Sequence, residues 1–188
     1  MATTRTRPPL DIADARVRLS RTPETLAAIC AGWPDHLWQV NEGPGTWSAR
    51  EVVCHLLHGE DDDWIPRMRV ILEAGRSRRF EPFDREKGNA VYGSLPPEQL
   101  LNLFAEKRAA SLAAFDRWRI VEPALQQVGI HPEFGEVTLE QLLATWVTHD
   151  LAHLVQIARI VEKYYGRWAG PWRRYFSALK NEPAPAGD

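Results

Sequence analysis

The chain has 188 residues, of which 44% are hydrophobic and 26% charged, and this ordinary usage excludes a disordered or fibrous protein. Its formal net charge of -2 at pH 7 provides no strong field for nucleic acid or anionic lipid, so we expect a small-molecule partner, no nucleic acid and no membrane. The length suits one helical domain over residues 11–180, with a flexible N-terminus at 1–10 and a flexible tail at 181–188.

The cysteines and the start of the chain indicate a cytoplasmic protein. Cys30 and Cys54 lack CxxC spacing and lie among apolar neighbours, so we interpret them as reduced core thiols. The basic start is followed by no apolar stretch of the kind found in secretory signals, and no apolar run approaches the roughly 20 residues of a spanning helix.

Helical start and stop signals dominate the chain and alternating strand patterns are nearly missing, which predicts an all-α fold. The first helix is expected over 23–31, with Thr22 as its N-cap and Pro23 at its first position; the alternative is a longer helix that includes residues 12–19. The second helix begins after Ser48, which forms a capping box with Glu51. It should run to about residue 73 with a kink at Pro66.

A third helix is predicted to start between residues 94 and 97 and to run to about 118. A fourth runs from the capping box of Thr138 and Gln141 to Gly166, followed by a short helix at 172–179. Four helices of this size predict a four-helix bundle. The connections 76–93 and 119–137 exceed the usual length of about 2 to 8 residues, so at least one should cross the bundle and let the second and third helices run parallel.

The fourth helix carries His149 and His153, four residues apart on its apolar face. This spacing separates two side chains by about 40° around the helix, so both imidazoles can bind one ion. Two buried core histidines with hydrogen bonds are an equally good interpretation of this pair alone.

The second helix offers three further polar candidates. His55 lies at the edge of the apolar stripe, and His58 lies well outside it, where a surface position is expected. Glu60 falls in the middle of the stripe, where an ionised carboxylate needs a cation or several donors. It is therefore a candidate catalytic residue, and the alternative is a structural salt bridge to Arg67 or Arg159.

Several segments together resemble the DinB/YfiT-like superfamily over most of the chain. They are Asn41-Glu-Gly-Pro-Gly-Thr-Trp47-Ser48, Glu51-Val-Val-Cys-His55-Leu, Phe80-Glu-Pro-Phe-Asp84-Arg85, His131-Pro-Glu-Phe-Gly135 and Trp146-Val-Thr-His149-Asp150-Leu-Ala-His153-Leu-Val-Gln156-Ile. The resemblance implies an up-down-down-up four-helix bundle, a homodimer, and a divalent metal ion held by His55, His149 and His153.

Three neutral imidazoles leave a coordination position open, which is typical of catalytic rather than structural zinc sites. Imidazole ligands suit zinc, nickel, iron and copper alike, and of these zinc or nickel is the expected ion. Gln156 or Asp150 is the expected partner of a ligand imidazole. The resemblance implies a metal-dependent enzyme on a small molecule, either a transferase that uses a low-molecular-weight thiol or a hydrolase. The alternative is a non-catalytic stress-related or ligand-binding bundle whose metal is structural or sensory.

Overall fold

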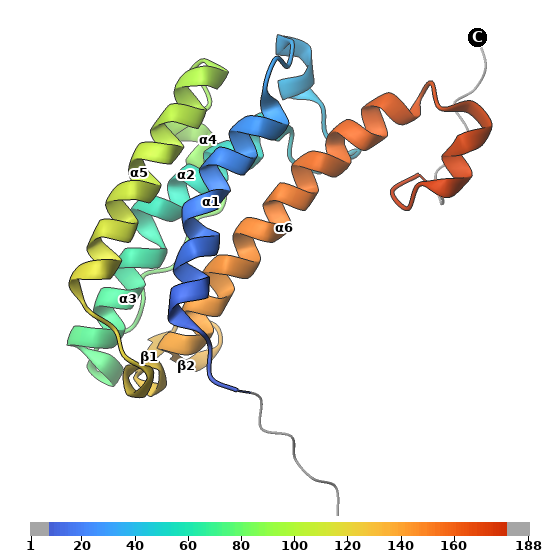
Figure 1. Ribbon diagram of the computed structural model, residues 1–188. Coiled ribbons are helices and arrows are strands. Elements are labelled where there is room, and N and C mark those ends of the chain that lie inside the picture. The colour runs from blue at the N-terminus through green and yellow to red at the C-terminus, as the bar shows by residue number, and fades with distance from the viewer. Residues whose placement is uncertain (1–7, 180–188) are drawn as a thin grey trace, which may run out of the picture.

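The computed structural model describes residues 8–179 and consists of long helices packed lengthwise (Figure 1). The principal helices are α1 (Ile12–Cys30), α2 (Ala49–Asp62), α3 (Trp64–Glu73), α5 (Pro97–Arg117) and α6 (Leu139–Gly166), where α2 and α3 together form one broken helix. Shorter elements are η1 (Asp35–Gln39), η2 (Gly75–Ser77), α4 (Lys87–Tyr92), η3 (Glu122–Gln126), β1 (Val128–His131), β2 (Gly135–Thr138) and η4 (Gly170–Tyr175). Within residues 8–179, no helix combines the length and the apolar character needed to span a bilayer.

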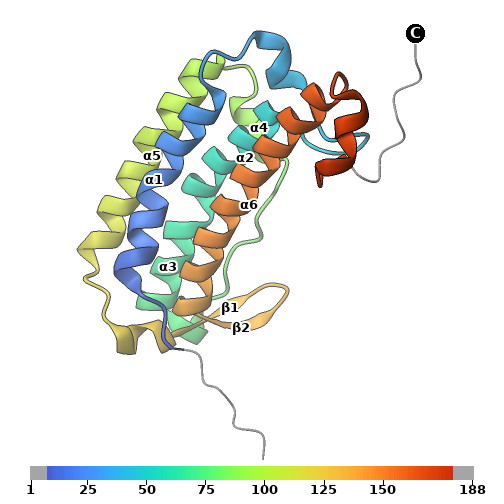
Figure 2. The same ribbon diagram turned by 45° about the vertical axis from the view of Figure 1, so that its right-hand side comes forward.

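The topology is the predicted up-down-down-up arrangement of a four-helix bundle. Helices α1 and α6 run in one direction, whereas α2–α3 and α5 run in the opposite direction (Figures 1 and 2). The segment 74–96 crosses from the far end of α3 back to the start of α5 and carries α4 against α2. The segment 118–138 stays at one end of the bundle and carries the β1–β2 hairpin (Figure 2). One of the two long connections is therefore the predicted crossover.

The bundle contains two apolar clusters separated by a polar layer. One cluster includes Trp64, Met68 and Trp146, and the other includes Leu57 and Phe104. Between them, buried polar side chains from all four long helices form the layer, and its hydrogen-bonded members are Thr22, Glu60, Arg108 and Asp150.

The start predicted for the first helix is wrong, and the longer alternative is correct. Helix α1 begins after Asp11, whose carboxylate accepts the backbone N–H groups of the first turn, and Pro23 lies in its interior. A proline leaves the carbonyl four residues earlier without its helical donor. That carbonyl belongs to Leu19 and accepts a hydrogen bond from Arg108 Nη1 at 2.8 Å. Thr22 is no cap; its hydroxyl donates to Asp150 Oδ2 at 2.6 Å.

The kink predicted at Pro66 occurs as a break at Asp63, between α2 and α3. Pro66 then falls in the first turn of α3, where a backbone donor is not needed. The capping boxes of Ser48 and Thr138 are both formed, as predicted.

The remaining differences lie in short segments. Instead of a helix at 172–179, the chain forms η4. The β1–β2 hairpin was not predicted, and its turn ends at Gly135, whose φ of 74° is a left-handed conformation that favours glycine. Cys30 and Cys54 are free and buried, as expected. The predicted flexible ends fall mostly outside the described residues, although the backbone N–H of Leu10 donates to Glu140 at 2.9 Å. The domain limits 11–180 stay a prediction.

Candidate metal centre

Three histidines from two helices meet near the middle of the bundle. His55 projects from α2, and His149 and His153 project from α6 one turn apart. Nε2 of His149 lies 2.9 Å from Nε2 of His55 and 3.1 Å from Nε2 of His153. One ligand nitrogen from each residue lies within 4.8 Å of the other two. The structure thus brings together the three residues that the resemblance implied as ligands.

The spacing of the nitrogens fits a single ion. Nitrogens about 2.0–2.1 Å from one tetrahedral zinc ion are separated by about 3.3 Å, a few tenths of an ångström more than the two distances from His149 Nε2. His153 Nδ1 lies 2.8 Å from Gln156 Oε1, which can only accept, so Nδ1 carries the proton and Nε2 keeps a free lone pair. Gln156 is therefore the partner that orients this imidazole; Asp150, the other candidate, binds Arg108 instead.

Burial keeps the three imidazoles neutral. Burial lowers the pKa of His55 to about 4, and the nearby His153 contributes to this shift. Burial lowers the pKa of His149 to about 2, with further contributions from His153 and His55. The pKa of His153 is also lowered by burial, against an opposing effect of Gln156. Neutral imidazole is the form that binds a metal ion.

The histidines face a cavity of about 640 Å³. The crossover segment and the hairpin cover it, and the two are joined by a hydrogen bond from the Phe80 amide to the Ile130 carbonyl at 2.9 Å. The lining residues are Trp47, His55, Asp63, Trp64, Arg67, Phe80, Pro82, Phe83, Arg85, His131, Pro132, Glu133, Phe134, Val137, Leu142, Thr145, His149 and His153. This volume is within the range of small-molecule sites.

The surface position predicted for His58 is wrong. Its side chain is only 3% exposed and stacks on Phe83 with ring centroids 4.7 Å apart. The crossover covers the face of α2 that carries His58, where Gly88 lies against the backbone of Cys54 and the Cβ of His58. Periodicity within one helix cannot show that a distant segment covers its outer face. His58 is not part of the three-histidine group.

Glu60 lies in the polar layer and does not line the cavity. Its carboxylate accepts hydrogen bonds from Arg108 Nε at 3.0 Å and Nη2 at 2.7 Å. The salt-bridge alternative is therefore correct in kind, but the partner is neither Arg67 nor Arg159, which pair with Asp63 and Glu42. The structure pairs the Glu60 carboxylate with Arg108 in the bundle interior, away from the cavity. A catalytic role for Glu60 stays a prediction.

Other cavity residues were not assigned a role from the sequence. Arg85 and His131 line the cavity together with the three histidines. Both lie in segments that carried part of the family resemblance, but neither segment alone predicts that these two side chains meet in one cavity. His131 Nδ1 accepts the backbone N–H groups of Glu133 and Phe134, each at 3.2 Å. Asp63 has its pKa raised to about 6 by burial, although Arg67 opposes this shift.

Comparison with known proteins identifies the family. Residues 18–157 match the DinB superfamily. The structure is similar to YfiT from Bacillus subtilis, which is described as a probable metal-dependent hydrolase with an unusual four-helix bundle topology. The TM-score is 0.72, the sequence identity is 18%, and the alignment covers 87% of this chain and 95% of YfiT. It is also similar to the four-helix bundle protein TT2238, with a TM-score of 0.54, 20% identity and coverage of 78% and 97%.

A third similar structure is a mycothiol-dependent maleylpyruvate isomerase, with a TM-score of 0.60, 13% identity and coverage of 85% of this chain and 69% of that one. No curated protein matches the sequence. At these identities the structural similarities establish the four-helix bundle fold. The sequence match covers more than half of the chain, and the protein therefore belongs to the DinB superfamily.

Proposed function

We propose that this protein is a metal-dependent enzyme that acts on a small molecule bound in the cavity, with His55, His149 and His153 as the metal ligands. The observation that carries the proposal is the convergence of three Nε2 atoms on the wall of a cavity of about 640 Å³. A purely structural ion would need no such cavity beside it.

Three neutral imidazoles suit a divalent ion such as zinc or nickel, which when bound activates water or a thiol as a nucleophile near neutral pH. The chain's own residues provide the remaining functions. Gln156 holds the imidazole of His153 in the ligating tautomer, and the aromatic rings of the cavity exclude bulk water from the reacting atoms. Asp63, with its pKa of about 6, is suited to accept a proton near neutral pH.

Hydrolysis is the reaction that these features favour, because a carboxylate of raised pKa lines the same cavity as the histidines. The similar YfiT, described as a probable metal-dependent hydrolase, supports this choice. Transfer of a low-molecular-weight thiol is the second candidate, supported by the fold shared with a mycothiol-dependent isomerase. The homodimer and the cytoplasmic location stay predictions.

A turnover screen of the metal-loaded protein tests the proposal. Ester, amide and lactone substrates would be assayed with and without a low-molecular-weight thiol, against protein stripped by a chelator and against Asp63→Asn. We expect turnover that requires the ion and falls by about 10²- to 10⁴-fold in Asp63→Asn if this carboxylate transfers a proton. Turnover that persists unchanged after complete metal removal would contradict the proposal.

A further inference from the structure

The charged residues of the cavity are unequally compensated. Its lining contains the carboxylates of Asp63 and Glu133 and the guanidinium groups of Arg67 and Arg85. Asp63 and Arg67 neutralise each other, with Arg67 Nη1 2.8 Å from Asp63 Oδ1. The guanidinium of Arg67 also lies 5.5 Å from the centre of the Phe80 ring. The charge of Arg67 is therefore compensated within the protein, although its buried Nε has no hydrogen-bond partner among the described residues.

Arg85 is different, because it makes no ion pair with any residue between 8 and 179. Arg85 lines the cavity together with all three histidines of the candidate metal centre, and Phe83, two residues before it, contacts the His55 ring with centroids 5.6 Å apart. Glu133 lies in the turn of the β1–β2 hairpin, where its backbone N–H donates to His131 Nδ1 at 3.2 Å. The uncompensated positive charge therefore lies at the histidine end of the cavity, and Glu133 lies at the hairpin end.

A second donor lines the cavity from the hairpin. His131 accepts two backbone N–H groups at Nδ1, so its neutral ring carries the proton on Nε2. A neutral ring is the expected form, because burial lowers the pKa of His131. Arg85 offers only donors as well. Apart from Glu133 in the hairpin turn, the polar side chains left over after the internal pairs are satisfied include the donors Arg85 and His131, which suit an acceptor.

Apart from the three histidines and Thr145, whose hydroxyl donates to the Gln141 carbonyl, the rest of the lining is apolar and aromatic. Trp47 packs on His55 with ring centroids 4.6 Å apart, and Phe83 meets the same imidazole edge-on at 5.6 Å. Phe134 stacks on His131 at 4.4 Å. These rings can hold the flat or apolar body of a ligand close to the histidines.

We infer that the substrate of this site is a small organic anion, whose carboxylate binds Arg85 and whose apolar body lies against the aromatic rings of the cavity. The inference rests in part on the proposed function, because an ion held by three neutral imidazoles adds two positive charges beside Arg85. A guanidinium and a carboxylate form strong, often bidentate, charge-assisted hydrogen bonds, so Arg85 is a specificity-determining residue of the site.

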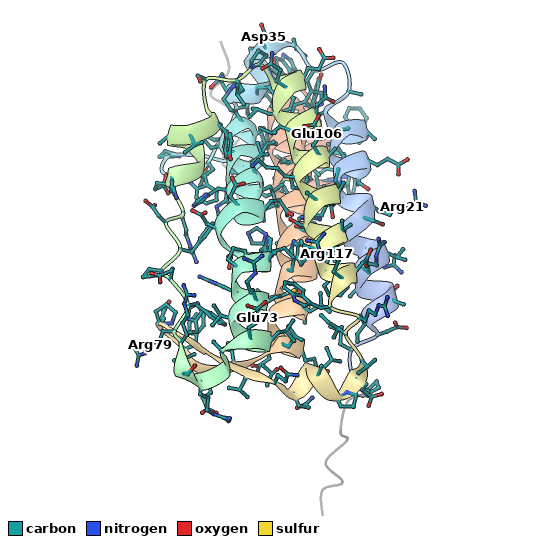
Figure 3. The ribbon with its side chains drawn as sticks, turned by 90° about the vertical axis from the view of Figure 1, so that its left-hand side faces the viewer. Arg21, Asp35, Glu73, Arg79, Glu106 and Arg117 are labelled. Carbon is teal, nitrogen blue, oxygen red and sulfur yellow. The ribbon has the colours of Figure 1, made fainter. Side chains whose placement is uncertain are left out.

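The test compares 4-phenylbutyrate with its uncharged amide, 4-phenylbutyramide, by isothermal titration calorimetry. Both probes would be titrated into the wild type, Arg85→Met, Arg85→Lys and the control Arg79→Met, each zinc-loaded and each metal-free. Arg79 is a suitable control because it lies on the same crossover and is exposed, as Arg85 is, but extends away from the bundle (Figure 3) and does not line the cavity.

We expect the wild type to bind the acid at least roughly tenfold more tightly than the amide, in both metal states. Arg85→Met should weaken acid binding roughly 10- to 100-fold and leave amide binding unchanged, Arg85→Lys should recover part of the loss, and Arg79→Met should behave as the wild type. Equal binding of acid and amide, no binding of either at millimolar concentration, or unchanged acid binding in Arg85→Met would overturn the inference.

The two proposals fail separately in this experiment. If the protein retains no zinc but metal-free wild type still prefers the acid through Arg85, the metal proposal fails and the anion site stands. If zinc binds stoichiometrically and Arg85→Met changes nothing, the anion site fails and the metal proposal stands.

Discussion

Replacement of Arg108 by methionine tests the role of the polar layer most sharply. The guanidinium is 1% exposed and donates to Glu60, to Asp150 and to the Leu19 carbonyl that Pro23 leaves without a helical donor. Methionine matches much of the side-chain volume but leaves two carboxylates and one carbonyl without their guanidinium donor, and Asp150 then keeps only the Thr22 hydroxyl. Breaking a buried ion pair in this way costs about 3–5 kcal/mol of unfolding free energy.

The matched control is Arg16→Met. Arg16 binds Asp116 with two hydrogen bonds of 2.7 Å, but this pair is 40% and 45% exposed, so its loss should cost less than about 1 kcal/mol. Urea unfolding followed by far-UV circular dichroism, in metal-free buffer, would measure both variants. A cost of Arg108→Met no larger than that of the control would refute the structural role assigned to the layer.

The cost of Arg108→Met should also depend on pH. Burial already raises the pKa of Glu60, and Arg108 opposes this shift. Without Arg108 the pKa of Glu60 rises further. When the pKa of a carboxyl group is higher in the folded than in the unfolded protein, the folded protein loses stability as pH rises through that pKa. The difference in unfolding free energy between wild type and variant should therefore be smaller at pH 5 than at pH 8. A difference that does not change with pH would contradict this account.

Three further predictions concern packing and the histidines. Gly88→Ala would place a Cβ 2.5 Å from the Cys54 carbonyl oxygen, so urea unfolding should show a loss of about 1–3 kcal/mol of unfolding free energy. The control Asn89→Ala, at an exposed position, should lose about 0.5 kcal/mol or less. Equal losses in the two variants would contradict the close approach of Gly88 to Cys54. In metal-free protein the unfolding free energy should fall as pH drops below about 6.5. The pKa values of His55 and His149 are lowered in the folded protein, so between pH 6.5 and 5 mainly the unfolded chain binds protons at these residues. An unfolding free energy that stays constant between pH 7 and 5 would contradict the lowered pKa values. Chelation at 25 °C should leave the far-UV circular dichroism nearly unchanged, because both apolar clusters form without the histidines, and a collapse of the helical signal would show a structural ion.

Local signals in the sequence predicted the helices well where capping defined them. Ser48 and Thr138 fix the starts of α2 and α6 through contacts within four residues, which a single sequence displays directly. The first helix was predicted too short because Pro23 is normally a start signal. Its interior position depends on Arg108, which lies 89 residues from the Leu19 carbonyl in the chain, and no local pattern shows that contact.

The candidate site was predictable only in part for the same reason. Helical spacing placed His149 and His153 on one face, and the family resemblance added His55. The burial of His58 and the position of Arg85 depend on where the crossover segment lies, which the periodicity of α2 does not contain. The partner of Glu60 depends on the alignment of α2 with α5, so the sequence indicated a cation but not which one.

Metal content of protein purified without a histidine tag tests the central claim most directly. Zinc or nickel would be supplied, excess ion removed by dialysis, and the bound ion counted by inductively coupled plasma mass spectrometry in wild type and in single alanine variants of His55, His149, His153 and His58. We predict one ion per chain in the wild type and in His58→Ala, whose imidazole is buried but stands apart from the three-histidine group, and loss of stoichiometric metal in each of the other three variants. Full retention of the ion in His149→Ala, or its loss only in His58→Ala, would contradict the assignment of the metal centre.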